Sequence, residues 1–241
     1  MKWQVPKIWD EECWVICGGS SIIDQFNIPA HIIPETKEEF VEFGDFLSPI
    51  HNKRCIGVNI AAFLGDWVDV SYWGDSDTYT EYKSWYDKYA GLKISSAGKF
   101  DTDLFKDIKY LHKFTDTGFT TDPSLVSWIT KNSGGSAVDV AQKLGAKTIY
   151  ILGLDMYHHP SGRMHWHSGY PAKILTPTKK QLDAGKPHPR RMPMKSFNRH
   201  LKGWDEMAEE AKTLNIEIFN VNPKSEIKAF PRVSLNEALG I

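Results

Sequence analysis

The residues best suited to chemistry gather in one segment, Leu154–Gly169, which reads LDMYHHPSGRMHWHSG. It contains one aspartate, Asp155, one tyrosine, Tyr157, and four histidines. The histidines are His158, His159, His165 and His167. An aspartate with several imidazoles could ligate a metal, and imidazoles could also transfer protons or contact phosphate. Because the spacing matches no zinc signature and no cysteine accompanies it, we favour proton transfer or phosphate contact over a metal site.

Two glycine-rich turns could hold phosphate. ICGGSS ends an apolar run and opens a helix that Ser20 or Ser21 could cap, and SGGS precedes a second helix. Glycines let backbone approach an anion, and a helix N-terminus offers free N–H groups and the positive end of its dipole. The candidate nucleotide-binding residues in these turns are Gly18, Gly19, Ser20, Ser21, Ser133, Gly134, Gly135 and Ser136. From these residues alone, a tight turn without a ligand stays open.

Two further features suit a nucleotide ligand. Asn59 follows a short apolar strand, so it would lie at the sheet edge where open α/β folds hold ligands. Lys179–Lys202 carries eight Lys or Arg against one acid, Asp183. Such a charge concentration suits a diphosphate or a polyanionic acceptor, for which a glycan or DNA are the candidates. A turn asparagine and a solvated basic loop remain the plain alternatives.

Apolar strands and amphipathic helices alternate along the chain. Strands are expected at 13–17, within 55–75, at 92–97, at 148–154 and at 216–223, and residues 99–132 are not assigned. Ala137, Val140, Ala141 and Leu144 share one helix face, and Gly145 would end that helix. One helix is expected over 196–215. The alternation predicts an α/β chain with a Rossmann-like, mostly parallel sheet flanked by helices.

The composition bounds the class of protein. The chain has 241 residues, 41% hydrophobic and 24% charged, with a net charge of −1, which gives no overall reason to bind nucleic acid or an anionic membrane. Three cysteines at no metal-finger spacing indicate reduced, buried thiols. No apolar run has transmembrane length and no signal peptide is evident, so we expect a cytoplasmic location. We expect one domain over 1–241, with a His-, Pro- and Lys/Arg-rich lid or acceptor-binding loop at about 158–196.

The stretch SGGSAVDVAQKLGAKTIYILGLDMY resembles the metal-independent bacterial sialyltransferases and their superfamily. That superfamily includes MptE-like 6-hydroxymethylpterin diphosphokinases and flagellin-modifying Maf proteins. CGGSSI, GVNIAAF and IEIFNVNPKSEIKAF match further family segments in the same order, so the resemblance covers roughly two thirds of the chain. Residues 76–130 show no match.

The resemblance assigns roles residue by residue. It places nucleotide binding on Gly18, Gly19, Ser20, Asn59, Ser133 and Gly134. Tyr157 matches the tyrosine that contacts the leaving phosphate, and Arg163 lies near the place of a second such tyrosine. The family's general base falls on Asn198, so His200, two residues on, is our candidate. His165, His167 and His188 are the alternatives.

The resemblance therefore implies a glycosyltransferase that moves a sugar from a nucleotide-sugar donor to an acceptor hydroxyl, with no metal or other cofactor required. A second hypothesis is an ATP-dependent diphosphokinase, which would need Mg²⁺ and carboxylates such as Asp66, Asp69 and Asp155. A third is a nucleotide- or nucleic-acid-binding protein without catalysis. The donor, the acceptor and any homo-oligomer stay open.

Overall fold

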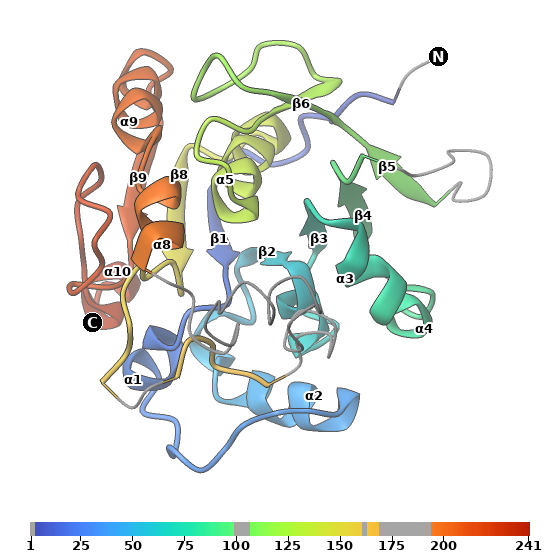
Figure 1. Cartoon of the computed structure of the whole chain (residues 1–241), viewed down its shortest axis with the longest axis vertical. Coiled ribbons are helices and arrows are strands. Elements are labelled where there is room, and N and C mark those ends of the chain that lie inside the picture. Colours follow the sequence, from blue (N-terminus) through green and yellow to red (C-terminus); the bar gives the residue numbers. More distant parts are fainter. Residues whose placement is uncertain (1–2, 99–106, 161–162, 169–193) are drawn as a thin grey trace, which may run out of the picture.

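A parallel sheet organises the molecule (Figure 1). The computed structural model describes residues 3–98, 107–160, 163–168 and 194–241. Within them the main sheet has seven strands in the order β5-β4-β3-β2-β1-β8-β9, and every neighbouring pair is parallel. Its strands are β1 (Glu12–Ile16), β2 (Arg54–Val58), β3 (Val70–Trp73), β4 (Leu92–Ser95), β5 (Ile108–Tyr110), β8 (Thr148–Leu152) and β9 (Glu217–Asn220). Two short strands, β6 (His112–Phe114) and β7 (Leu125–Ser127), pair separately.

Helices cover both faces of this sheet. Successive residues of a strand point to opposite faces, so in β1 Val15 packs with α5 and α9 while Trp14 packs with residues of α1 and α2. Strands buried on both sides must be apolar throughout, which explains the sequence of β1 and β8. The helices are α1 (Ser21–Gln25), α2 (Lys37–Asp45), η1 (Ser48–Ile50), η2 (Asn59–Leu64), α3 (Ser76–Glu81), α4 (Lys83–Tyr86), α5 (Ser133–Leu144), α8 (Met194–His200), α9 (Trp204–Thr213) and α10 (Leu235–Leu239).

The expected Rossmann-like architecture is confirmed, but one helix was predicted to be longer than the structure shows. Gly145 ends α5 in the left-handed conformation (φ 112°), as its position predicted. The helix expected over 196–215 is instead two helices, because the chain turns at Gly203, whose φ of 81° breaks the helical path. Residues 99–132, left unassigned, contain β5, β6 and β7 in their described part.

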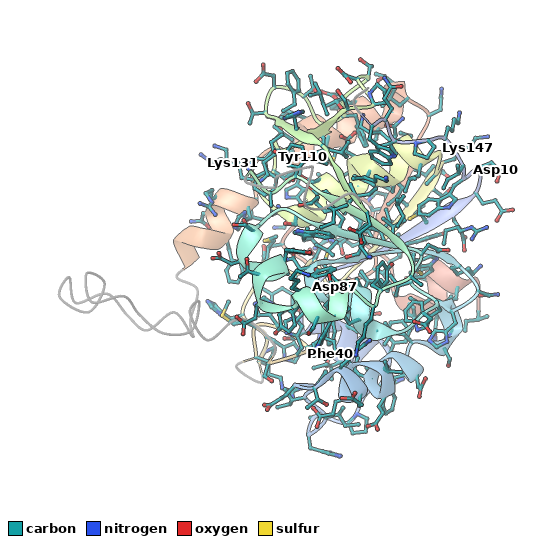
Figure 2. All side chains as sticks on the ribbon, turned by 90° about the vertical axis from the view of Figure 1, so that its right-hand side faces the viewer. Asp10, Phe40, Asp87, Tyr110, Lys131 and Lys147 are labelled. Carbon is teal, nitrogen blue, oxygen red and sulfur yellow. The ribbon has the colours of Figure 1, made fainter. Side chains whose placement is uncertain are left out.

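The strand order reverses between β1 and β8. From β1 the chain proceeds to β2, β3, β4 and β5 on one side, while β8 and β9 lie on the other (Figure 1). Side chains of open α/β folds bind ligands at the carboxyl ends of strands beside such a reversal. Figure 2 shows Lys131, which lies at this carboxyl edge, on the opposite side of the molecule from Asp10 and Lys147, which precede β1 and β8.

Part of the expected lid lies outside the described residues. Of the segment 158–196, residues 161–162 and 169–193 are not described, and with them most of the basic stretch and His188. All three cysteines are buried and free, as expected. None of the helices in the described ranges combines the length and apolar character that crossing a bilayer needs.

Candidate active site

A pocket of about 290 Å³ opens at the carboxyl edge beside the strand reversal. It collects residues from the loops that follow β1, β2, β3, β7 and β8, together with the end of α8. Nine of the residues singled out in the sequence line it: Gly18, Gly19, Asn59, Ser133, Gly134, Asp155, Tyr157, His165 and His200. The two glycine-rich turns, far apart in sequence, therefore meet at one cavity.

The turn after β1 is tied to the turn after β8. The Gly19 amide donates to the Gly153 carbonyl at 2.8 Å, and a Cβ on Gly19 would lie 2.5 Å from Asp155 Oδ2. Glycine is therefore required by close packing of the two turns. Because the Gly19 N–H already has an acceptor, it is not available to a phosphate as the sequence suggested.

The cap of α1 differs from the expectation that Ser20 or Ser21 supplies it. Ser20 stands at the N-cap but makes no capping bond with its side chain. Asp155 Oδ2 instead accepts from the Ser21 amide at 2.9 Å, and Asp155 Oδ1 accepts from Ser21 Oγ at 2.5 Å and from Asn222 Nδ2 at 2.9 Å. A carboxylate thus already occupies the positive end of this short helix. Ser20 and Ser21 do not line the pocket.

The start of α5 is the better place for an anion. Asn132 Oδ1 caps this twelve-residue helix by accepting from the Gly135 amide at 2.9 Å. Ser133 and Gly134 occupy its first positions, where amides have no partner inside a helix, and both line the pocket. Gly135 and Ser136, which were also predicted to bind the nucleotide, do not line the pocket. Gly135 packs against Thr130, and Ser136 Oγ donates to the Ser127 carbonyl at 2.6 Å.

Asn59 lies in the pocket wall in a strained conformation. Its φ of 56° is in the left-handed region that few residues other than glycine adopt. Its Oδ1 is buried and has no hydrogen-bond partner among the described residues. The left-handed backbone and the buried, unpartnered oxygen of Asn59 both cost free energy, so their presence indicates a functional constraint.

Tyr157 follows β8 and faces the same cavity. Burial raises the pKa of its phenol, and a hydrogen bond with Asn222 opposes that rise. The hydroxyl therefore keeps its proton at neutral pH and can donate it in a hydrogen bond to an anionic oxygen.

Two histidines reach the pocket and differ in basicity. His165 Nδ1 lies 3.2 Å from the Gly18 carbonyl oxygen, which can only accept, so Nδ1 carries the proton. Burial lowers the pKa of His165 to about 4. Burial, followed by the nearby Arg199 guanidinium, lowers the pKa of His200 as well. Both rings are neutral at pH 7. His200 ends α8, whereas His165 belongs to the segment 163–168.

Two residues considered for catalysis lie outside the lining of this pocket. His167 is buried between the rings of Phe40 and Trp166, at centroid distances of 5.8 and 4.6 Å. Arg163 donates through Nη2 to the Ile32 carbonyl at 3.3 Å. These contacts pack the segment 163–168 against the body of the protein, and a catalytic role for either residue stays a prediction.

Several lining residues carried no signal in the sequence. Trp128 and Lys131 come from the unassigned stretch 99–132, Asp75 ends a stretch interpreted only as strands, and Phe197 lies in one interpreted only as a helix. Cys17 also lines the pocket, but burial raises the pKa of its thiol, which keeps it protonated and unreactive.

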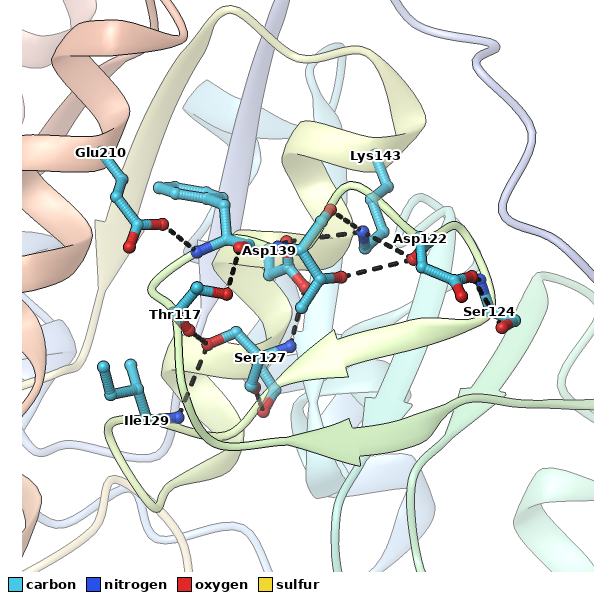
Figure 3. A network of polar contacts seen from close by, with 11 residues as sticks. Thr117, Asp122, Ser124, Ser127, Ile129, Asp139, Lys143 and Glu210 are labelled. Atoms are coloured by element: carbon cyan, nitrogen blue, oxygen red, sulfur yellow. Dashed lines mark hydrogen bonds and ion pairs between the residues drawn. The ribbon is translucent and has the colours of Figure 1, made fainter.

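A buried network fixes the loop that carries Trp128 (Figure 3). Asp139 on α5 accepts from the amides of Thr120 and Ser127 at 3.2 and 2.8 Å, and Lys143 Nζ lies 3.8 Å from it. Glu210 on α9 accepts from the Phe119 amide at 2.8 Å. These bonds hold β7 on α5, so the residues between them, 128–132, have fixed ends.

The carboxylates proposed for magnesium binding do not come together. Asp69 accepts from the Cys55 amide at 2.8 Å and from Arg54 at 3.2 Å, outside the pocket, and Asp155 is engaged as described. Throughout the described ranges no three His, Cys, Asp or Glu side chains group closely enough to hold a metal ion.

Comparisons with known proteins bear on the fold. No family model and no curated protein matches the chain. Among solved structures, it aligns with the Maf glycosyltransferase from Magnetospirillum magneticum AMB-1 at a TM-score of 0.54 and 12% identity, over 96% of this chain and 35% of that one. It aligns with a sialyltransferase Cst-II variant in complex with CMP at a TM-score of 0.51 and 14% identity, over 93% and 87% of the two chains.

The chain spans about a third of the length of the Maf structure and most of the Cst-II structure. At these identities the likeness is one of fold. We conclude that this protein shares its fold with the Maf glycosyltransferase and the Cst-II variant.

Proposed function

We propose that the protein is a glycosyltransferase that moves a sugar from a nucleotide-sugar donor to an acceptor hydroxyl without a required metal ion. The observation that carries the proposal is one pocket that combines the open amides of α5, the protonated phenol of Tyr157 and the neutral imidazole of His200. These are an anion site, a hydrogen-bond donor and a base. The fold likeness to glycosyltransferases supports the same reaction class.

Each group has a defined task in the reaction. His200 accepts the proton of the acceptor hydroxyl as its oxygen attacks the anomeric carbon of the donor. The bond between that carbon and the phosphate oxygen breaks, and its electron pair leaves with the nucleotide. Tyr157 and the first amides of α5 donate to the departing phosphate, a stabilisation that needs no cation.

The donor and the acceptor define the specificity. The Cst-II structure that shares the fold was determined with CMP, which makes cytidine nucleotides the first donors to test. The acceptor in our proposal is an alcohol of a glycan or of DNA, attracted by Lys131 and Arg199, which line the pocket. The separation of Asp69 from the pocket disfavours a magnesium-dependent diphosphokinase.

Thermal shift with matched ligands tests the proposal. CMP-, UDP-, GDP- and ADP-linked sugars and ATP are added singly, in EDTA and in Mg²⁺. A ligand that binds only the folded state raises the unfolding temperature. We expect one nucleotide-sugar class to do so equally in both buffers. Stabilisation by ATP only with Mg²⁺, or by no nucleotide at all, would reject the proposal.

Turnover of the donor found in this way then tests the site. We expect Tyr157→Phe to reduce transfer by about 10²–10³-fold, because one donor to the developing phosphate charge is lost. Tyr150→Phe is the matched control, since Tyr150 on β8 stacks between Trp14 and Phe219 outside the pocket lining. Equal rates for the two variants would remove Tyr157 from the mechanism.

A further inference from the structure

Trp128 forms a rigid aromatic wall of the pocket. Lys113 Nζ lies over its ring, 3.5 Å from the centroid, and donates to the Gly74 carbonyl at 2.8 Å. A cation on an aromatic face is held by the negative potential of the ring. The indole is therefore clamped on one face by a side chain that is itself fixed at the end of β3.

Glycine at position 74 lets the indole approach the sheet. A Cβ there would lie 2.9 Å from Trp128 Cζ3 and 2.8 Å from Ser133 Oγ. The Trp128 amide also donates to the Phe114 carbonyl at 2.6 Å, and the network around Asp139 holds the preceding strand β7 (Figure 3). The ring is thus positioned before any ligand arrives, so no side-chain entropy is lost on binding.

The place of Trp128 distinguishes it from the nucleotide end of the pocket. The strand reversal lies between β1 and β8, where Gly18, Asp155 and Tyr157 line the cavity. Trp128 packs at the end of β3, two strands from β1. Neighbouring strands are about 4.8 Å apart, so the two ends are separated by about 10 Å. A ligand with its phosphate between them would extend the group attached to that phosphate toward Trp128.

The surroundings of Trp128 suit a sugar ring. Asp75 and Lys131 line the pocket beside it, offering a carboxylate and an ammonium to hydroxyl groups, while an indole face accepts the C–H face of a pyranose. We infer that Trp128 is the platform on which the transferred sugar of the donor stacks, and hence a specificity-determining residue of the site. The inference rests on the proposed function and adds which residue recognises the sugar.

Binding of matched ligand pairs tests this role. Affinities of the wild type, Trp128→Leu and Trp128→Phe are measured by calorimetry for CMP against CMP-N-acetylneuraminic acid, UDP against UDP-N-acetylglucosamine and GDP against GDP-mannose. For the pair that binds, we expect Trp128→Leu to weaken the nucleotide sugar by about tenfold and the free nucleotide less than twofold. Trp128→Phe keeps an aromatic ring, so its affinity for the nucleotide sugar should decrease less than that of Trp128→Leu.

The control is Trp67→Leu, since Trp67 is also half-buried and stacks on His51 at 4.3 Å outside the pocket lining. Binding of the free nucleotide shows that each variant is folded. Equal weakening of both ligands would mean that Trp128 stacks on the base, and unchanged binding of both would mean that it touches neither. Either result overturns the inference and leaves the proposed function standing. Failure of every nucleotide to bind the wild type would overturn both.

Discussion

Asp155, which lines the pocket, is hydrogen-bonded to Ser21, which lies 134 positions away in the sequence. The Asp155 carboxylate receives both the amide and the hydroxyl of Ser21, at 2.9 and 2.5 Å, and so joins the turn after β1 to the turn after β8. Burial raises the pKa of Asp155, and the hydrogen bonds from Ser21 and Asn222 oppose that rise. The two turns on either side of the strand reversal are therefore fixed relative to each other.

This contact predicts a measurable coupling in stability. Ser21→Ala and Asp155→Ala should each lower the free energy of unfolding. The decrease in the double variant should be smaller than the sum of the two single decreases, by a coupling energy of about 0.5–3 kcal/mol. Urea unfolding measures the three values. Ser71→Ala is the control, because the buried Ser71 hydroxyl has no partner among the described residues, and it should be neutral. Strict additivity of the two substitutions would contradict the contact.

Asn59 should show a conflict between stability and function. Asn59→Gly removes a left-handed strain and a buried, unpartnered oxygen, so unfolding free energy should stay level or rise by about 1 kcal/mol while donor binding weakens. Asn215→Gly is the control: Asn215 has a φ of 54° at an exposed turn after α9, and its replacement should leave binding unchanged. A destabilised Asn59→Gly protein with intact donor binding would refute this account.

The pH dependence of transfer should identify the base. His200→Ala should reduce turnover by about 10²–10⁴-fold with little change in donor affinity. Because burial and Arg199 lower the pKa of His200, its ring stays unprotonated below the usual histidine range, so kcat/KM should hold through pH 6.5 and fall only at lower pH. His112→Ala, on exposed β6, is the control. An acidic limb that falls near pH 4 would instead indicate His165, whose pKa is about 4.

Asp139 should make the protein less stable as pH rises through mild acidity. Burial raises its pKa to about 6, against about 3.9 in an unfolded chain, so the native state binds the extra proton between these values. The wild type should therefore lose about 3 kcal/mol relative to Asp139→Asn between pH 4 and pH 7. Urea unfolding of both proteins across this range measures the difference. If the wild type instead became more stable relative to Asp139→Asn as the pH rises, the contacts of the Asp139 carboxylate with Lys143 and the Ser127 amide would outweigh the cost of burying its charge.

The sequence by itself determined the elements whose signals are local. The apolar face of α5, its stop at Gly145 and the nearly all apolar strand β8 follow from spacing within a few residues. The alternation of strands and helices determined the parallel sheet. The position of Asn59 and Tyr157 at the carboxyl edge follows in the same way, because Asn59 directly follows β2 and Tyr157 lies in the turn after β8.

Only the tertiary structure decided which of these residues line the pocket. Serine is a common residue at helix caps, yet at Ser21 the Asp155 carboxylate from the turn after β8 takes that role. His167 is two residues from His165 in the sequence, but it is buried beside Phe40. Trp128 has no local signal, since its place depends on Gly74 and Lys113 from other strands. Contacts between residues far apart in the chain depend on how the sheet is assembled, and spacing within one segment does not carry that information.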